Sequence, residues 1–568
     1  MKQKQIIALV SATALAATAL AGCGKTSEEN TQTTAVSEAE GTAKEDLPLS
    51  KYPETVTVHL GGSLNPNAKI PDGMSYEDNS YTRFLKDDLN IEVVYDWVAS
   101  SSDFDEKMNL CIGSGTIPEL MNVNATQYGA LLKYDMIQPL DQYFDDYASD
   151  TLKGYVESGG EELKKCISND KGEMMAIPAP NITAGGINEM WIRQDWLDNL
   201  GLEAPRTWDE MATVAEAFVT QDPDGNGEAD TIGILGPSNS DHMNAIGGNQ
   251  YGLDPLFSRF QSYPQYWLQD EDGTVKYGSI QPETRTALEK IQKLYTDKLI
   301  DPEMLVRNDS MEPLLAGKVG IFFGPWWCGY TVADATLAGE ADWRAYFTPL
   351  AEDGNYYTHM PDPTSTYVVV SKSCKNPEAA IKIINYLIAY GKDWVADGTV
   401  AKMEISQFYP LWNVYENADE IEVSTETLEK YLAGEITMDD VDFSQHNLLK
   451  NDMEVVTELK KEPYDDFSLD KWNLDSDLAK TNLPRLVSLL VGGNPLVNDK
   501  YIPVYNAYSG QTETMQAKWA NLKKMEEETF AKIIMGKADI SEFDTFVENW
   551  KNQGGDQILK EINDELSK

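Results

Sequence analysis

The segment TVTVHLGG at residues 55–62, followed by IEVVY at residues 91–95, indicates the fold class of this chain. The first segment alternates apolar and polar residues, and this period of two is typical of a half-buried β-strand. Residues 81–89 between the two segments have a helix-like pattern, and residues 104–114 form a second such stretch that ends in a glycine-rich break. Strand, helix, strand and helix in short steps predict α/β units around a largely parallel sheet.

A second block of this kind begins at residues 189–193 (EMWIR), where a further strand is expected. A helix is expected next, at residues 195–200. A capping box follows it, in which Thr207 is the N-cap and Glu210 stands three residues later. We also expect strands at 321–323 and 367–370, and helices at 207–219, 378–388 and 541–550. The body that follows residue 50 is too long for one hydrophobic core, so it predicts two or more lobes.

The composition is globular and strongly acidic. Apolar residues make up 42% of the chain, and 93 Asp and Glu oppose 46 Lys and Arg, which gives a formal charge of −47. Nucleic-acid binding requires cationic side chains that neutralise phosphates, so this surface argues against such a partner. A polyanionic ligand is also disfavoured unless arginines cluster locally.

The N-terminus has the pattern of an export signal. Lys2 and Lys4 precede an apolar run at residues 6–20, and the run ends in Ala21-Gly22-Cys23. The run has about 15 residues, whereas a helix needs about 20 to cross a bilayer. The stretch resembles the lipobox of bacterial lipoproteins, in which cleavage leaves a cysteine that carries a lipid. The alternative is an ordinary secretory signal in which Cys23 has no special role.

We therefore expect a signal peptide at 1–22, and a lipidated Cys23 that begins a disordered tether at 23–52. The tether is rich in Ser, Thr, Glu, Ala and Lys and cannot bury enough apolar surface to fold. The protein is expected to be extracytoplasmic and anchored to the cell membrane, with a mature charge of about −49 after the loss of Lys2 and Lys4.

The remaining cysteines give no metal-binding pattern. Cys111, Cys166, Cys328 and Cys374 are far apart and show no CxxC spacing. A zinc site is therefore not indicated. Pairing in an oxidising compartment and free buried thiols both stay open, and we expect mostly free thiols.

The sharpest local motif is DPDGNGEAD at residues 222–230. Its oxygen-bearing side chains follow the spacing of the first part of an EF-hand calcium loop. We predict a structural Ca²⁺ held by Asp222, Asp224, Asn226, Glu228 and Asp230. The twelfth position is Gly233, where a true EF-hand has Glu, so the motif favours a brace over a switch. An acidic turn that binds no ion is the alternative.

Aromatic residues form the second candidate site. Trp326 and Trp327 directly follow an expected strand in the segment GPWWCGY, and Trp412 and Tyr508 lie in other aromatic-rich segments. Sugar rings have apolar faces that stack on Trp and Tyr, so these four residues are candidate ligand contacts. Each of them is equally well explained as part of a hydrophobic core.

Catalytic motifs are not evident. The chain has four histidines, and it contains no HExxH, GxSxG or P-loop pattern. Paired carboxylates could support glycosidase chemistry, but with 93 acidic residues a pair arises by chance. We therefore predict no enzyme activity and no catalytic residue.

Several segments resemble, in the expected order, the family 1 extracellular solute-binding proteins of ABC importers. The segments are SGTIPEL at 114–120, WIRQDWL at 191–197, LGL at 200–202, TWDE at 207–210, GKVGI at 317–321, NPEAA at 376–380, and FDTFV at 543–547 with GG at 554–555. The tail is similar to the LipO-type lipoprotein subgroup, and the calcium loop to that of alginate-oligosaccharide-binding proteins. Thr231 is a departure, because some relatives have a further acidic ligand there.

The resemblance implies a two-lobed α/β fold of the periplasmic-binding-protein type (type II), with a ligand cleft between lobes that are joined by strand crossings. The expected divisions are lobe 1 at 53–178, lobe 2 at 179–360 with the calcium loop, a return to lobe 1 at 361–405, and a mostly helical part at 406–568 that completes both lobes.

The expected function is the capture of an oligosaccharide by hinge closure and its delivery to the transmembrane subunits of an ABC permease, with the protein acting as a monomer. Arg193 is a further candidate for ligand binding, and a surface ion pair is its alternative. A cell-surface glycosidase or lyase is the second hypothesis, and an extracellular sensor that presents a ligand to a receptor is the third.

Overall fold

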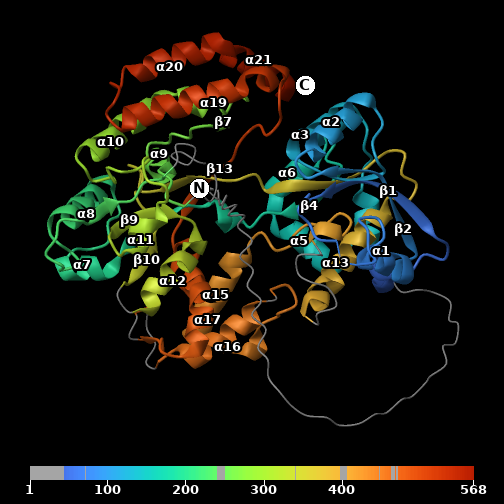
Figure 1. The fold of residues 1–568 in the computed structure, drawn as a ribbon, viewed down its shortest axis with the longest axis horizontal. Helices are drawn as coiled ribbons and strands as arrows, with labels where there is room; N and C mark the ends of the chain where they lie inside the picture. The colour runs from blue at the N-terminus through green and yellow to red at the C-terminus, as the bar shows by residue number, and fades with distance from the viewer. Residues whose placement is uncertain are drawn as a thin grey trace, which may run out of the picture.

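The computed structural model describes residues 44–70, 72–238, 250–338, 341–396, 406–446, 448–461, 467–468 and 471–567. The predicted signal peptide, Cys23 and most of the predicted tether lie outside the described residues. Figure 1 shows two α/β bodies side by side, with a group of helices (α15, α16 and α17) below and between them. We refer to the bodies as lobe 1, on the right in Figure 1, and lobe 2, on the left.

Lobe 1 is built on a five-stranded sheet with the order β2-β1-β3-β12-β4. The strands are β1 (Val56–Leu64), β2 (Ile91–Ser100), β3 (Leu120–Val123), β4 (Ile177–Pro180) and β12 (Thr364–Val370). β1 runs parallel to β2 and β3, as expected, but β12 is antiparallel to both of its neighbours. Four of the five strands therefore run in one direction, and β12, which enters from the other lobe, is the exception that makes the sheet mixed.

Short helices surround this sheet. They are α1 (Ser80–Phe84), α2 (Phe104–Ser114), α3 (Ala125–Lys133), α4 (Asp141–Tyr147), α5 (Asp150–Ser158), α6 (Gly160–Ile167) and α13 (Glu378–Ala396). Local sequence explains where two of them begin, because Asn79 and Asn124 accept backbone N–H groups as N-caps of α1 and α3. The core beneath the helices includes Val58, Leu60 and Val368, none of which is more than 2% exposed.

Lobe 2 is built on a four-stranded sheet with the order β10-β5-β9-β6. The strands are β5 (Glu189–Arg193), β6 (Ile232–Ile234), β9 (Val319–Gly324) and β10 (Trp343–Tyr346). Only the β6–β9 pair is parallel, so this sheet is also mixed. A two-stranded hairpin of β7 (Trp267–Gln269) and β8 (Val275–Tyr277) accompanies it.

Both faces of the lobe 2 sheet are buried, and alternate residues of β5 enter different cores. Trp191 belongs to one core, while Met190 and Ile192 belong to the other, because successive strand side chains point to opposite faces. The second core contains residues of α7 (Gln194–Leu200), α8 (Trp208–Thr220), α9 (Asp254–Ser258), α10 (Pro282–Thr296), α19 (Glu513–Ile534), α20 (Glu542–Trp550) and α21 (Asp556–Leu566). The capping box of α8 is confirmed, since Thr207 Oγ1 accepts from the Glu210 N–H and Glu210 accepts from the Thr207 N–H.

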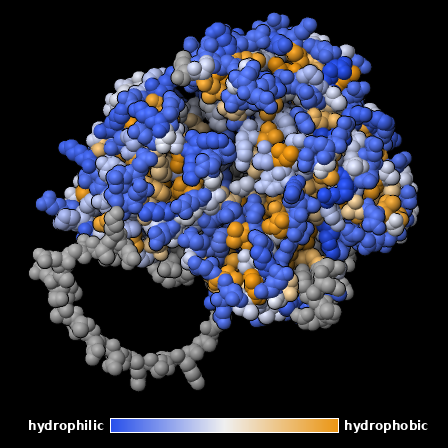
Figure 2. Space-filling model, turned by 180° about the vertical axis from the view of Figure 1, so that it is seen from behind, coloured by the Kyte–Doolittle hydropathy of each residue, from blue (hydrophilic) through white to orange (hydrophobic). Residues whose placement is uncertain are grey.

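The first of these two cores is covered by the helical group between the lobes. This group comprises α15 (Glu420–Leu432), α16 (Leu449–Leu459) and α17 (Asp477–Val487). The adjoining elements of the same core are α11 (Met311–Leu315), α12 (Gly329–Leu337), the turn η9 (Ser488–Gly492) and α18 (Asn494–Asn498). Figure 2 shows a mostly hydrophilic surface on the rear face, broken by small separate hydrophobic patches. None of the described helices is both long and apolar enough to cross a membrane.

The chain passes between the lobes three times in the described residues. It leaves β4 and reaches β5 through the turn η3 (Thr183–Gly186), and it returns from β11 (Tyr356–His359) to β12. Residues 408–415 pack in lobe 1, after which α15 joins the helical group of lobe 2. β11 pairs in parallel with β13 (Tyr501–Val504), and this pairing brings the C-terminal part of the chain next to the connection between β11 and β12.

Candidate functional site

A small cavity of about 30 Å³ lies where the three connections meet, and we call it the crossing pocket. Lobe 1 contributes Gly159 at the junction of α5 and α6, and Glu162 from α6. The connections and the segment after β13 contribute Asn181, Thr183, Met360, Pro361, Asp362, Pro363, Ala418 and Tyr505. The pocket therefore has walls from both lobes and from the segments that join them.

Backbone hydrogen bonds tie the connections to one another. The N–H of Asn181 donates to the Pro363 carbonyl at 2.9 Å, and its side-chain amide donates to the Asp362 carbonyl at 2.8 Å. The N–H of Thr183 donates to the carbonyl of Ala418 at 2.8 Å. The three connections are therefore bonded to one another at a single place between the lobes.

The electrostatics of the crossing pocket are acidic. Burial raises the pKa of Asp362, although Ser509 Oγ donates to its carboxylate at 2.8 Å. Burial also raises the pKa of Tyr505, and the Glu162 carboxylate adds to that effect. The Tyr505 hydroxyl is therefore a neutral hydrogen-bond donor at physiological pH, and no cationic side chain is among the described residues that line the pocket.

Trp326 and Trp327 follow β9 directly, in the short turn η6 (Trp326–Cys328), which contacts the connection η3. Trp326 is only 8% exposed and packs in the core of lobe 2, and its indole N–H has no hydrogen-bond partner among the described residues. Trp327 is half-buried at the margin of that core. Of the two indoles, Trp327 is thus the more accessible at this end of the sheet.

Two carboxyl groups are buried close to this end of β9. Glu189 pairs with Gly324 across the sheet, and neither of its carboxyl oxygens has a partner among the described residues. Burial raises its pKa well above the usual value, and Glu422 on α15 adds to the shift. Burial raises the pKa of Glu422 to about 7. The raised pKa of Glu189 favours its neutral, protonated form, which avoids the cost of an unpaired buried charge.

None of the predicted ligand residues is among those that line the crossing pocket, and Trp412 and Tyr508 pack elsewhere. Trp412 packs against lobe 1, where its carbonyl accepts from the Asn122 amide at 3.3 Å. Tyr508 packs in lobe 2, and its hydroxyl donates to Glu565 at 3.1 Å. These contacts are those of structural aromatic residues.

Arg193 lies at the end of β5 opposite to Glu189. Its side chain is buried, and Nε donates to Asp195 at 2.8 Å while Nη1 donates to the Gly317 carbonyl at 3.3 Å. The guanidinium also stacks over the Trp196 ring at 4.6 Å. These contacts favour the ion-pair alternative over ligand binding.

Tyr505, Glu162, Asn181 and Asp362 are site residues that sequence reasoning missed. Tyr505 belongs to the aromatic-rich segment YNAY, in which only Tyr508 was selected. Asp362 stands between two prolines, and Asn181 directly follows Pro180. Prolines that fix an extended backbone indicate such connections, in keeping with the expected lobe divisions after residues 178 and 360, but they do not show which polar side chains line a pocket.

The predicted calcium loop connects α8 to β6 and lies away from the crossing pocket. Asp222 accepts the N–H groups of Asn226 and Gly227 at 3.1 and 3.0 Å. Asp230 forms an ion pair with Lys318 at 2.7 Å. The described residues contain no group of three or more His, Cys, Asp or Glu side chains arranged to hold a metal. The four cysteines after Cys23 are free thiols in the structure.

Comparison with known proteins assigns the family. Residues 67–392, more than half of the chain, match the family described as bacterial extracellular solute-binding protein, and the chain belongs to that family. The resemblance inferred from sequence is thus confirmed. Membership makes the chain a binding protein rather than an enzyme, which removes the glycosidase or lyase hypothesis.

The relatives include lipoprotein LipO of Bacillus subtilis, which is 23% identical over 83% of this chain and 86% of its own length. The fructooligosaccharide ABC transporter substrate-binding protein FusA of Streptococcus pneumoniae is 30% identical, but over only 40% of this chain. The match therefore covers less than half of the length of FusA, namely 43%.

Solved structures confirm the two-lobed fold. The complex of FusA from S. pneumoniae with kestose superposes with a TM-score of 0.50 at 16% identity, over 90% of this chain and 99% of that one. A human-milk-oligosaccharide-binding (HMO) solute-binding protein from Bifidobacterium longum infantis gives a TM-score of 0.51 at 18% identity, over 90% and 98% of the two chains. At these identities the likeness establishes the fold, an α/β periplasmic-binding-protein fold with two mixed sheets.

Proposed function

We propose that this protein captures a carbohydrate of oligosaccharide size between its two lobes, closes about the connections, and delivers the ligand intact to an ABC permease. The observation that carries the proposal is the meeting of three hydrogen-bonded connections at one place between the lobes. The crossing pocket there, of about 30 Å³, is too small for a sugar ring, so the ligand would lie beside it, between the lobes. Two relatives are named as binders of fructooligosaccharides and of polygalacturonan or rhamnogalacturonan, and these names support a glycan as the ligand.

The groups in the crossing pocket and on the neighbouring turn η6, which contacts the connection η3, suit a sugar. Trp327 and Tyr505 offer aromatic faces for the C–H surface of a ring, and Asn181 and Glu162 offer polar groups for hydroxyls. Because the pocket is lined by carboxyl groups and the whole chain has a formal charge of −47, the field favours neutral glycans over uronate oligomers.

A calorimetric titration with a panel of neutral and acidic oligosaccharides tests this function. We expect stoichiometric binding of a neutral glycan that is recovered intact. Trp327→Ala should weaken binding by roughly 1–3 kcal/mol, the range of a lost aromatic contact. Trp208→Ala is the control, since Trp208 is a half-buried residue at the start of α8 that packs on Phe260 away from the connections.

Unchanged affinity in Trp327→Ala would refute the stacking contact. Binding of no glycan in the panel would refute the proposed ligand class. We expect the other predicted ligand residues to act through packing. Their substitution should therefore lower the stability of the fold more than the affinity for the glycan; these residues are Trp326, Trp412, Tyr508 and Arg193.

The proposal extends to location and partners. Lipid attachment at Cys23 would hold the protein at the outer face of the cell membrane, where it meets the transmembrane subunits of the permease. The lipobox-like segment and the lipoprotein relative LipO support the anchor. A Cys23→Ala chain should leave the membrane fraction, and continued membrane association would contradict the anchor.

We also propose a structural Ca²⁺ in the loop between α8 and β6. Asp222, Asp224, Asn226, Glu228 and Asp230 would hold it, and all five offer the oxygen ligands that this hard cation takes. Burial raises the pKa of Asp224, and its contact with Asp222 raises it further. Two carboxyl groups held this close fit a site for a cation, because a cation would relieve their repulsion.

A further inference from the structure

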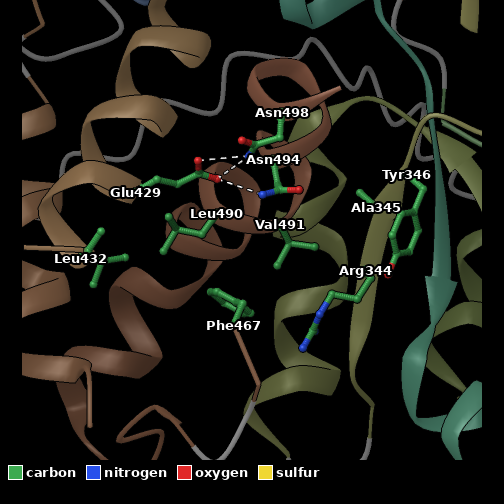
Figure 3. Close-up of a pocket in the computed structure, with 11 residues that line it drawn as sticks. Arg344, Ala345, Tyr346, Glu429, Leu432, Phe467, Leu490, Val491, Asn494 and Asn498 are labelled. Atoms are coloured by element: carbon green, nitrogen blue, oxygen red, sulfur yellow. Dashed lines mark hydrogen bonds between the residues drawn. The ribbon is translucent and has the colours of Figure 1, made fainter. Parts of the chain in front are cut away.

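A second and larger cavity, of about 550 Å³, lies within lobe 2 and is separate from the crossing pocket; we call it the lateral pocket (Figure 3). It is bounded by the edge strand β10 on one side and by α15, η9 and α18 on the other. No residue of lobe 1 lines it, so its shape does not depend on opening or closing of the lobes. Its volume falls in the range of about 300–1,000 Å³ that is usual for small-molecule sites.

The floor of the lateral pocket is apolar. Leu490 and Val491 on η9 and Ala345 on β10 are buried in the core of lobe 2, and Leu432 on α15 adds a further apolar wall. Figure 3 shows the side chains of Leu490 and Val491 between the polar groups on either side. A ligand with one apolar face can rest on this floor.

A carboxylate and two amides form one polar wall. The side-chain amides of Asn494 and Asn498 on α18 donate to Glu429 on α15, at 2.9 Å and at 3.0 and 3.1 Å. These bonds orient both asparagines and leave their carbonyl oxygens without a protein partner among the described residues. The wall thus presents fixed hydrogen-bond acceptors.

Arg344 on β10 forms the opposite wall. Its Nη1 donates to Asp342 and to the Trp343 carbonyl, and its guanidinium lies 5.9 Å from the centre of the Phe467 ring. No described residue accepts a hydrogen bond from its Nε or Nη2, so these two groups are available as donors. Asp342 already balances the positive charge of Arg344.

We propose that the lateral pocket binds a short neutral sugar of one or two rings, independently of the crossing pocket. Donors on one wall, acceptors on the other and an apolar floor match the hydroxyls and the C–H face of a sugar ring, and Tyr346 adds an aromatic edge. An anion would be repelled by Glu429, while the charge of Arg344 is already compensated. A cation is also disfavoured, because the Glu429 carboxylate already accepts hydrogen bonds from two amides and the opposite wall carries the guanidinium of Arg344.

The test uses the full chain with ¹³C-labelled Leu and Val methyl groups. Maltose, cellobiose and xylobiose are the neutral probes, and digalacturonate and glucosamine are the charged comparators. We expect saturable shifts of the Leu432, Leu490 and Val491 methyl signals with at least one neutral disaccharide, and weaker shifts with both charged probes.

Two variants assign the binding to the lateral pocket. Asn498→Ala and Arg344→Lys should each weaken it by about tenfold, as expected for a lost hydrogen bond to a bound ligand. Asn482→Ala, on α17 and outside the lining, should leave it unchanged. Trp327→Ala should also leave it unchanged, which separates this site from the proposed interlobe function.

Three results would overturn the proposal. The first is the absence of a saturable methyl shift with every neutral probe. The second is tighter binding of digalacturonate or glucosamine than of every neutral probe. The third is a set of shifts that persists in both folded variants, Asn498→Ala and Arg344→Lys.

Discussion

Trp326 and Trp327 are neighbours in the sequence, yet their surroundings differ. The short turn η6 directs Trp326 into the core, where Gly492 allows its backbone to approach closely, because a Cβ at Gly492 would lie 2.4 Å from the Trp326 carbonyl oxygen. Trp327 stays half-buried at the margin. Sequence alone predicts that such a pair is either core or contact surface, but which of the two is exposed depends on η9, more than 160 residues further along the chain.

Buried carboxyl groups give a residue-scale prediction about pH. Glu526 on α19 is fully buried and accepts hydrogen bonds from Tyr277 Oη and Ser279 Oγ, both at 2.8 Å. Burial raises its pKa from 4.5 to about 7, so the folded state binds this proton more tightly than the unfolded state. The contribution of Glu526 to the free energy of unfolding is therefore complete below a pH of about 4.5, and it is lost as the pH rises through about 7.

Glu526→Gln removes this titration. Chemical unfolding at about pH 5 and about pH 8 should show that the variant loses less stability than the original chain over that interval, by at most about 3 kcal/mol. Glu528→Gln, exposed on the same helix, is the control. An equal loss in the Glu526 variant and the original chain would show that Glu526 does not titrate between these values.

At the scale of elements, the sequence predicted local structure well but not which strands run against the others. β1, β2, β5 and the capped start of α8 were expected from residue patterns and are present. These features depend on period-two alternation and on side chains within three residues of the cap, which are local. The antiparallel direction of β12 and the place of β10 at the sheet edge depend on connections between the lobes, which no local pattern records.

The loop between α8 and β6 gives the element-scale prediction. If the loop binds Ca²⁺, removal of the ion by a chelator should lower the melting temperature by several degrees, because an ion that binds only the folded state stabilises it. A double variant, Asp222→Asn with Asp224→Asn, should melt at the lower temperature with or without chelator. An unchanged melt of the original chain, with no calcium found in the purified protein, would contradict the site.

At the scale of the whole molecule, the sequence predicted two α/β lobes and where the chain divides between them, but not the residues that line the crossing pocket. The lobes were expected from length and from the family resemblance. The crossing pocket is assembled from residues 159–162, 181–183, 360–363, 418 and 505, which are widely separated in the chain. A site built from such distant segments cannot be read from any one motif, and this explains why none of the four predicted aromatic residues is among those that line it.

The central claim is that the two lobes close on a carbohydrate about their three connections. Small-angle X-ray scattering of the same protein, with and without the glycan that binds most tightly, measures this directly. We expect a smaller radius of gyration in the loaded protein and a return to the original value when the glycan is removed. The same radius in both states, with binding confirmed by calorimetry in the same sample, would contradict closure.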